Sequence, residues 1–96
     1  MEPIRKLIRA SGEESALPGP VSIAEVERLI GAGPLDSVML RDRKHVMLLD
    51  DLGISKGLPA NKEATRLYHE VCAPGTTHQI LGDVVIVPDS DFASDH

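Results

Sequence analysis

Aromatic residues and cysteine are scarce in this sequence. Its 96 residues include one Phe, one Tyr, one Cys and no Trp. Because there is almost no aromatic surface on which bases could stack, single-stranded nucleic-acid binding by stacking is disfavoured. The single Cys72 excludes an internal disulfide and a cysteine-rich zinc framework, and one cysteine is typical of a chain from a reducing compartment such as the cytoplasm.

Long apolar runs and signal-peptide features are also missing from the sequence. No stretch approaches the roughly 20 apolar residues that span a membrane. Residues 1–9 lack the apolar core of a secretory signal. We therefore expect a cytoplasmic location and no membrane partner.

The charge balance is acidic, with 15 Asp and Glu against 10 Lys and Arg and a formal net charge of −5. This sign repels phosphate backbones, so we expect no nucleic-acid partner. The apolar fraction of 42% and the charged fraction of 26% are typical of globular proteins and unlike those of disordered chains. A chain of this length fits one core, so we predict a single domain over residues 1–96.

Local patterns in the first third of the chain predict a strand, a loop and a helix. Residues 4–9 mix apolar and charged side chains as a short strand does, although so short a pattern fits a helix too. Residues 11–20, rich in Gly and Pro, predict a mobile loop with a brief edge strand at residues 15–17. Residues 22–25, Ser-Ile-Ala-Glu, match a capping box, which predicts that a helix spans about residues 23–31.

The middle of the chain has the pattern of a β-hairpin. Residues 36–40 and 45–50 are rich in apolar side chains and flank the polar turn 41–44. The second arm is apolar at four consecutive positions, which predicts an interior strand with both faces covered. Residues 50–59 then form a turn-rich connector.

A second helix and a last strand are predicted in the final third of the chain. Asn61 is a good N-cap for the helix, which the Pro-Gly pair at residues 74–75 would end. The β-branched residues 80–87 have the composition of a buried strand. Residues 89–96 form an acidic tail, whose carboxylates we expect to be solvated.

Together these elements predict an α+β fold with a small, mainly antiparallel sheet. The order is β-α-β-β-α-β, with the two helices packed on one face, as in ferredoxin-like domains. A near variant would add an edge strand from residues 15–21. An exposed edge of the first strand or of the hairpin would also allow a sheet-extending homodimer.

The start of the second predicted helix is the candidate ligand-binding site. Free backbone N–H groups and the helix dipole there could hold a phosphate or a carboxylate. The candidate residues are Lys56, Gly57 and Asn61 on one side, and Thr77, His78 and Gln79 on the other. The structural alternative is a tight turn, a helix cap and ordinary turn residues, and the lack of a glycine-rich phosphate loop favours it.

Candidates for metal binding and catalysis are weaker. His69, Cys72 and His78 could approach one another, but a fourth ligand is not evident and Cys72 fits a small buried apolar position. Asp50 and Asp51 are adjacent on a predicted strand, so their side chains point to opposite faces and do not form a pair. We therefore predict no metal, no cofactor, no catalytic residue and no enzymatic activity.

Four segments of the sequence form a distinctive set. They are residues 27–31 (Glu-Arg-Leu-Ile-Gly), 50–53 (Asp-Asp-Leu-Gly), 56–61 (Lys-Gly-Leu-Pro-Ala-Asn) and 80–86 (Ile-Leu-Gly-Asp-Val-Val-Ile). Together they resemble a family of small uncharacterised domains, a domain of unknown function that is found on phages, plasmids and conjugative elements of bacteria. The resemblance covers about residues 4–92, and its most specific part is the Gly-Leu-Pro-x-Asn block followed by the late Gly-Asp turn. The chain departs from many relatives at the Gly-Ala-Gly-Pro turn of residues 31–34.

The resemblance implies a small intracellular accessory protein of a mobile genetic element, and it brings no catalytic residues to carry over. We therefore expect a non-enzymatic protein of a phage or plasmid that binds a host protein, or a second copy of itself, and that could modulate a host or defence function. The alternative is a small-ligand binding protein, for a nucleotide or another anion, that uses the candidate site at Lys56, Gly57 and Asn61.

Overall fold

The computed structural model describes residues 4–93, which fold around a five-stranded sheet. The strands are β1 (Lys6–Ile8), β2 (Glu14–Ala16), β3 (Leu35–Met39), β4 (His45–Asp50) and β5 (Val84–Pro88). Their order across the sheet is β2-β1-β5-β4-β3, and each neighbouring pair is antiparallel. The predicted α+β class with an antiparallel sheet is confirmed, and so is the predicted hairpin of β3 and β4.

Four helical segments complete the described chain. They are α1 (Ile23–Ile30), α2 (Gly53–Lys56), α3 (Lys62–His69) and α4 (Ser90–Ala93). The predicted capping box begins α1, since the Ser22 hydroxyl accepts the N–H of Glu25 and the Glu25 carboxylate accepts the N–H of Ser22. Gly31 ends the helix in the left-handed conformation, with φ 67°. The local signals thus place α1 within one residue of its observed bounds.

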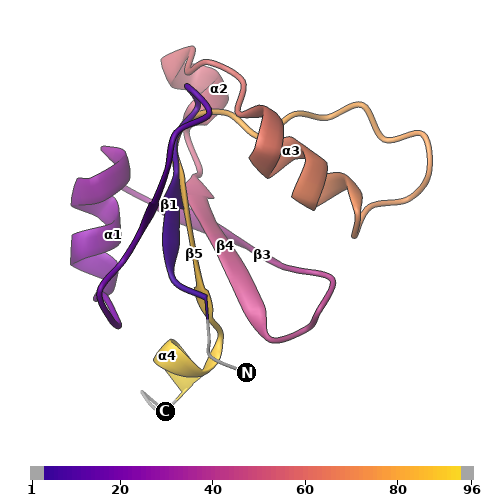
Figure 1. Cartoon of the computed structure of the whole chain (residues 1–96). Coiled ribbons are helices and arrows are strands. Elements are labelled where there is room, and N and C mark those ends of the chain that lie inside the picture. The colour runs from indigo at the N-terminus through magenta and orange to yellow at the C-terminus, as the bar shows by residue number, and fades with distance from the viewer. Residues whose placement is uncertain (1–3, 94–96) are drawn as a thin grey trace.

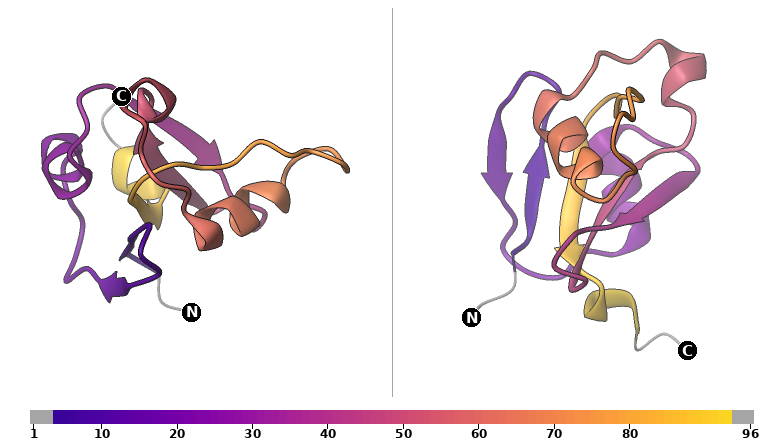
Figure 2. Two further views of the ribbon diagram at one scale, coloured as in Figure 1. Left: turned by 90° about the horizontal axis from the view of Figure 1, so that it is seen from above. Right: turned by 90° about the vertical axis from the view of Figure 1, so that its right-hand side faces the viewer.

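The two longer helices, α1 and α3, lie on opposite faces of the sheet (Figures 1 and 2). Leu7 of β1 packs with Val26 and Ile30 of α1, whereas the next residue, Ile8, packs with Ala64 of α3. Successive side chains of a strand point to opposite faces, so the two helices must cover different sides. The prediction that both helices pack on one face is therefore wrong.

The connections between the strands explain this arrangement. β2 and β3 are the two edge strands, and the antiparallel pairings make them run in the same direction. The connection between them, which contains α1, therefore crosses one whole face of the sheet. By contrast, α3 connects β4 to its antiparallel neighbour β5, a connection that need not cross the sheet. The ferredoxin-like order is not confirmed, because β2 adds a paired edge strand and the helices are on different sides. An apolar helical stripe fits either face, so the sequence pattern could not decide between them.

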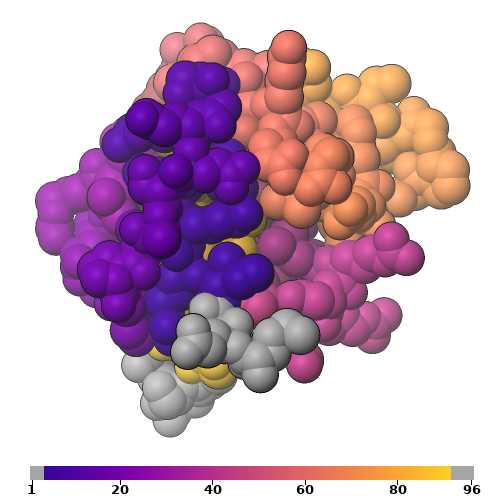
Figure 3. All heavy atoms as spheres, viewed as in Figure 1, coloured from indigo at the N-terminus to yellow at the C-terminus, as the bar shows by residue number. Residues whose placement is uncertain are grey.

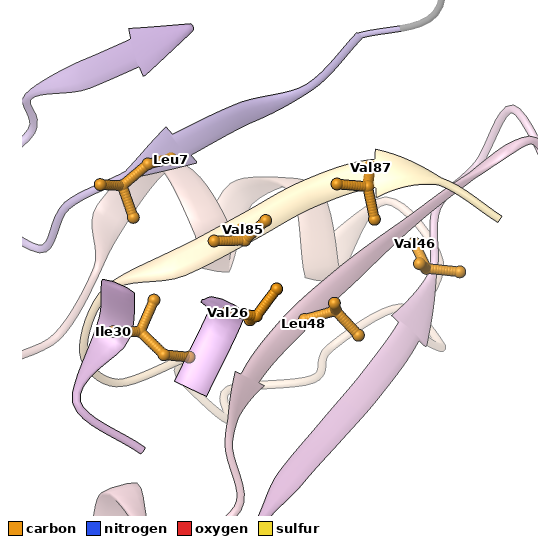
Figure 4. Close-up of a cluster of buried hydrophobic side chains, with 7 residues drawn as sticks. All are labelled: Leu7, Val26, Ile30, Val46, Leu48, Val85 and Val87. Atoms are coloured by element: carbon orange, nitrogen blue, oxygen red, sulfur yellow. The ribbon is translucent and has the colours of Figure 1, made fainter. Parts of the chain in front are cut away.

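Each face of the sheet carries one apolar layer. The layer beneath α1 consists of the buried residues drawn in Figure 4, namely Leu7, Val26, Ile30, Val46, Leu48, Val85 and Val87. The layer beneath α3 consists of Ile8, Met47, Ala64, Ile80, Val84 and Ile86. β5 and β4 contribute to both layers, which confirms that β4 is an interior strand and explains why its apolar run does not alternate.

Three element boundaries differ from the predictions. The connector after β4 contains the short helix α2, and α3 ends at His69 because the N–H of Val71 bonds to the carbonyl of Tyr68 in a tighter turn. The last strand begins at Val84 rather than at residue 80. Ile80 is buried, but its carbonyl accepts the N–H of Asn61, so this backbone is used to hold the start of α3.

Part of the predicted acidic tail is folded onto the sheet. Asp91 in α4 accepts two hydrogen bonds from the Arg5 guanidinium, at 2.8 and 2.9 Å, and its side chain is almost fully buried. This bidentate pair ties α4 to the start of β1. The prediction of a solvated tail is therefore wrong for Asp91, while residues 94–96 lie outside the described chain.

A pair of glycine substitutions tests the packing at the entrance to β5. Gly82 has φ +81°, and an added Cβ would lie 2.7 Å from Cδ1 of Leu58, whereas Gly75 has φ +88° with nothing within 4 Å. Gly75→Ala should cost only the left-handed backbone term, about 1 kcal/mol. Gly82→Ala should cost somewhat more in urea unfolding, because the end of the Leu58 side chain must also move. Equal losses would show that Leu58 does not hold this turn.

Candidate functional site

Asn61, one of the predicted ligand residues, is used by the fold itself. Its side chain is buried, with Asn61 only 1% exposed. The amide nitrogen donates to the carbonyls of Ile8 and Gly82 at 3.0 and 2.9 Å, and the amide oxygen accepts the N–H of Ala64 at 3.0 Å. The predicted N-cap is confirmed, and the whole amide is engaged by β1, α3 and the turn before β5.

The Gly-Leu-Pro-x-Asn block and the Gly-Asp turn meet in the folded chain. The N–H of Gly82 donates to the carbonyl of Pro59 at 2.7 Å, and Leu58 lies against Gly82. Gly57 adopts φ 67° at the end of α2, where its N–H donates to the carbonyls of Gly53 and Ile54. These two sequence blocks therefore contact each other in the fold. The N–H of Gly57 is already hydrogen-bonded within α2 and is not free to bind an anion.

Lys56 forms an ion pair that joins three elements. Its ammonium donates to the buried carboxylate of Asp50, at 2.7 Å, and to the carbonyl of Gly31, at 3.0 Å. Burial raises the pKa of Asp50, but hydrogen bonds from Lys56 and from the N–H of Leu52 outweigh it, so the pKa lies below its ordinary value. Lys56 thus ties α2 to the end of β4 and to the C-terminal end of α1.

Thr77, His78 and Gln79 are exposed on the loop between α3 and β5. His78 and Gln79 line a small hollow of about 220 Å³ together with Asp36, Asp50 and Asp51. None of Lys56, Gly57 and Asn61 is among the described residues that line it. The structure therefore brings His78 and Gln79 beside carboxylates, which repel an anion, and an anion-binding role for the six residues stays a prediction.

The metal candidates also have internal contacts. His69 Nε2 donates to the carbonyl of His78 at 2.7 Å, and the rings of Tyr68 and His78 stand edge to face with centroids 5.8 Å apart. Across residues 4–93, no three His, Cys, Asp or Glu side chains are grouped to hold a metal ion. Within the same range, no helix has the length and apolar character needed to cross a membrane.

A different surface carries two open hollows that are each larger than the one beside His78. Two hollows of about 530 and 570 Å³ lie between α3, the β3–β4 hairpin and the start of β1, and they share Leu40, Arg41 and Glu70. We call their combined surface the hairpin groove. Its apolar residues are Ile4, Met39, Leu40, Leu67, Val71 and Ile86, and its charged or titratable residues are Lys6, Arg41, Asp42, Arg43, His45 and Glu70. Figure 3 shows the bordering segments on one face: indigo β1, orange α3 and the magenta hairpin.

Apolar side chains are unusually exposed in the hairpin groove. Ile4, Met39 and Val71 are 51%, 42% and 39% exposed, and they make up half of the exposed large apolar residues in the described chain. Beneath them Ile86 is buried and Leu40 and Leu67 are half-buried. The groove therefore offers apolar contact area that residues 4–93 leave exposed.

The acidic groups of the groove accept hydrogen bonds from within the chain and keep their negative charge. Asp42 accepts the backbone N–H groups of Lys44 and His45 and lies 2.6 Å from His45 Nδ1, while Glu70 pairs with Arg66 at 3.1 Å. The N–H of Lys44, followed by the His45 side chain, lowers the pKa of Asp42 from 3.8 to about 2. His45 Nε2 accepts the N–H of Ile4 at 3.0 Å, so Nδ1 carries the ring proton and donates to Asp42.

The basic groups of the groove differ in their pairing. Lys6 pairs with Glu14 at 3.0 Å. Arg41 and Arg43 are exposed and form no ion pair with any residue that the structure describes. The residues that line the groove include three cations, Lys6, Arg41 and Arg43, against two carboxylates, so the lining is slightly positive although the whole chain carries a net charge of −5.

The hairpin groove was not among the sites predicted from the sequence. Arg41 and Arg43 stand in a polar hairpin turn, where charged residues are common and carry no functional signal of their own. Met39 and Val71 belong to apolar patterns that predict burial. The only sequence signal was the concentration of three basic residues in the turn 41–44 of an acidic chain.

Comparisons with known proteins identify no relative. No protein-family model matches the sequence, and no curated protein or solved structure matches the chain. The resemblance to a family of small domains from phages and plasmids therefore stays a prediction.

The ion pair of Lys56 generates a first prediction at this site. Lys56→Met removes the ammonium and leaves the buried carboxylate of Asp50 without its cation. The free energy of unfolding should fall by about 1 to 3 kcal/mol in urea denaturation. Lys62→Met removes an exposed ammonium from α3 and should change stability little. If both variants lose the same free energy of unfolding, the ion pair between Lys56 and Asp50 does not stabilise the fold.

The pKa of Asp42 generates a second prediction. Because the pKa in the folded chain is about 2, against 3.8 for the free group, the charged carboxylate adds stability above about pH 4 that disappears as the pH falls toward 2. The unfolding free energy of Asp42→Asn should therefore decline less than that of the wild type between pH 4 and pH 2. Asp51→Asn, which removes an exposed carboxylate, serves as the control and should follow the wild type. Parallel curves for Asp42→Asn and the wild type would contradict the expectation.

Proposed function

We propose that this chain is a non-enzymatic protein of a phage or plasmid that binds a host protein through the hairpin groove. The observation that supports binding is the exposure of Ile4, Met39 and Val71 around a partly buried apolar floor with a polar rim. Several exposed apolar side chains beside a polar rim are typical of protein-docking sites. The mobile-element origin and a modulating effect on a host or defence function rest on the sequence resemblance.

The form of the groove favours a protein over a small molecule. Small-molecule sites enclose most of the ligand surface in a concave pocket. The apolar side chains at the edge of this groove are 39% to 51% exposed, so the groove would leave a small ligand open to water. In the competing candidate site, Lys56 and Asn61 have internal partners that an anion would have to displace.

The free edge of β3 is a poorer docking element than the groove. The N–H of Leu40 donates to the carbonyl of His45, and the N–H of Asp51 donates to the carbonyl of Pro34. Hydrogen-bonded pairs alternate along an antiparallel ladder, so the N–H and C=O of Ser37 point away from β4 toward the free edge. The carboxylate of Asp36 accepts that outward N–H of Ser37 at 2.8 Å, so the middle donor of the edge is occupied. A homodimer that extends the sheet at β3 would have to break this contact.

The proposal is tested by capturing partners with groove variants. Met39→Asp combined with Val71→Asp adds charge to the apolar surface of the groove. Ile54→Asp adds one such charge at a residue of α2 that is 74% exposed and lies outside the groove. In quantitative pulldowns from bacterial lysate, the wild type and Ile54→Asp should enrich the same host protein, and the double variant should recover at least about tenfold less, a loss of about 1.4 kcal/mol in binding.

Circular dichroism and urea unfolding should first show that all three proteins are folded. If the double variant recovers the host protein as well as the wild type, the partner does not bind in the groove. If the wild type enriches no host protein at physiological salt, the proposed function is wrong.

A further inference from the structure

The turn that carries Arg41 and Arg43 is held in one conformation by backbone and side-chain hydrogen bonds. The N–H of Arg43 donates to the carbonyl of Leu40 at 2.9 Å, and Asp42 accepts the N–H groups of Lys44 and His45. Arg43 itself adopts φ 60°, a left-handed conformation that these bonds stabilise. Because the backbone is fixed, only the two arginine side chains have to be ordered when they meet a partner.

The local charge of the groove is opposite to the charge of the whole chain. Asp42 and Glu70 have cationic or N–H partners within the chain, whereas Arg41 and Arg43 have none among residues 4–93. Salt at physiological strength screens charges beyond roughly 8 Å, so these nearby groups dominate the potential that a docked segment meets. Carboxylates of a partner would complement the rim, and guanidinium groups bind carboxylates bidentately.

An extended polyanion fits the molecule less well than a short acidic segment. A nucleic-acid duplex would carry its phosphates past the groove and against a surface whose net charge is −5. A short peptide can place its carboxylates at Arg41 and Arg43 and end there. The apolar residues Ile4, Leu67 and Ile86 at one end of the groove give such a peptide a place for one large apolar side chain.

We infer that the hairpin groove binds an acidic peptide segment of its protein partner, with carboxylates at Arg41 and Arg43 and a large apolar residue over Leu67. This inference rests on the proposed function and specifies the chemistry of the partner. The apolar residue contributes buried area, and the carboxylates fix the direction and position of the segment.

The test uses a random 16-residue peptide library displayed on phage and selected on the full chain. The enriched peptides should carry net negative charge and at least one Leu, Ile, Met or Phe. The best of them, synthesised as a free peptide, should bind at least about tenfold more weakly to Arg41→Glu/Arg43→Glu than to the wild type. Arg41→Gln/Arg43→Gln, which adds no acid, should give a smaller loss in the same direction.

The control variant is Arg28→Glu/Lys62→Glu, which changes the net charge equally at exposed residues of α1 and α3 outside the groove. It should bind the peptide as the wild type does. Equal weakening in this control would overturn the inference, because the effect would then come from net charge alone. Enriched peptides without net negative charge, or no enrichment at all, would overturn it too.

A 12-base-pair DNA duplex is the competing probe. Tighter binding of the duplex than of the best peptide, lost in Arg41→Glu/Arg43→Glu, would show a phosphate site and overturn the inference. If the captured host protein depends on Met39 and Val71 but not on the two arginines, the proposed function stands and the inference fails. If acidic peptides bind at the arginines and no host protein is captured, the proposed function fails, but the inference that the groove binds acidic peptides is supported.

Discussion

The buried amide of Asn61 is the contact on which the arrangement of the molecule depends most. It bonds simultaneously to the carbonyl of Ile8 in β1, to the carbonyl of Gly82 before β5 and to the start of α3. A helix of eight residues is not stable alone in water, so α3 needs such tertiary contacts to keep its position. By fixing the start of α3 on the face opposite α1, Asn61 also sets where the other end of α3 meets the hairpin.

The hairpin groove follows from that position of α3. The helix ends at His69, and the chain then turns away at Glu70 and Val71, beside the exposed end of β3. The groups that could fill the space are the long polar side chains of Arg41 and Glu70, which reach toward water. The space thus stays open above Leu67 and Ile86, and its walls come from three segments that are distant in sequence.

Features that depend on a few neighbouring residues could be predicted from the sequence. The capping box of α1, the N-cap of α3 and the hairpin of β3 and β4 follow from local hydrogen bonding and side-chain period. The face that each helix covers could not be predicted, because it depends on the order of strands across the sheet. Likewise, a lysine before a glycine turn fits both an anion ligand and an ion pair, and only the folded chain brings Lys56 to 2.7 Å from Asp50.

Residues whose polar groups are hydrogen-bonded within the fold have a structural role in this molecule, and those whose polar groups lack such partners are the better candidates for binding. An anion at Lys56 or Asn61 would compete with bonds that are buried or partly buried, and each broken bond would leave a buried group without a partner at a cost of about 1 to 3 kcal/mol. A carboxylate at Arg41 or Arg43 would break no ion pair among residues 4–93, because neither guanidinium has an ion partner there. Met39 and Val71 are also exposed among the described residues, so a partner that buries them would gain the free energy of apolar burial. A partner can therefore gain binding energy at the hairpin groove. At Lys56 and Asn61, by contrast, the polar groups already stabilise the fold.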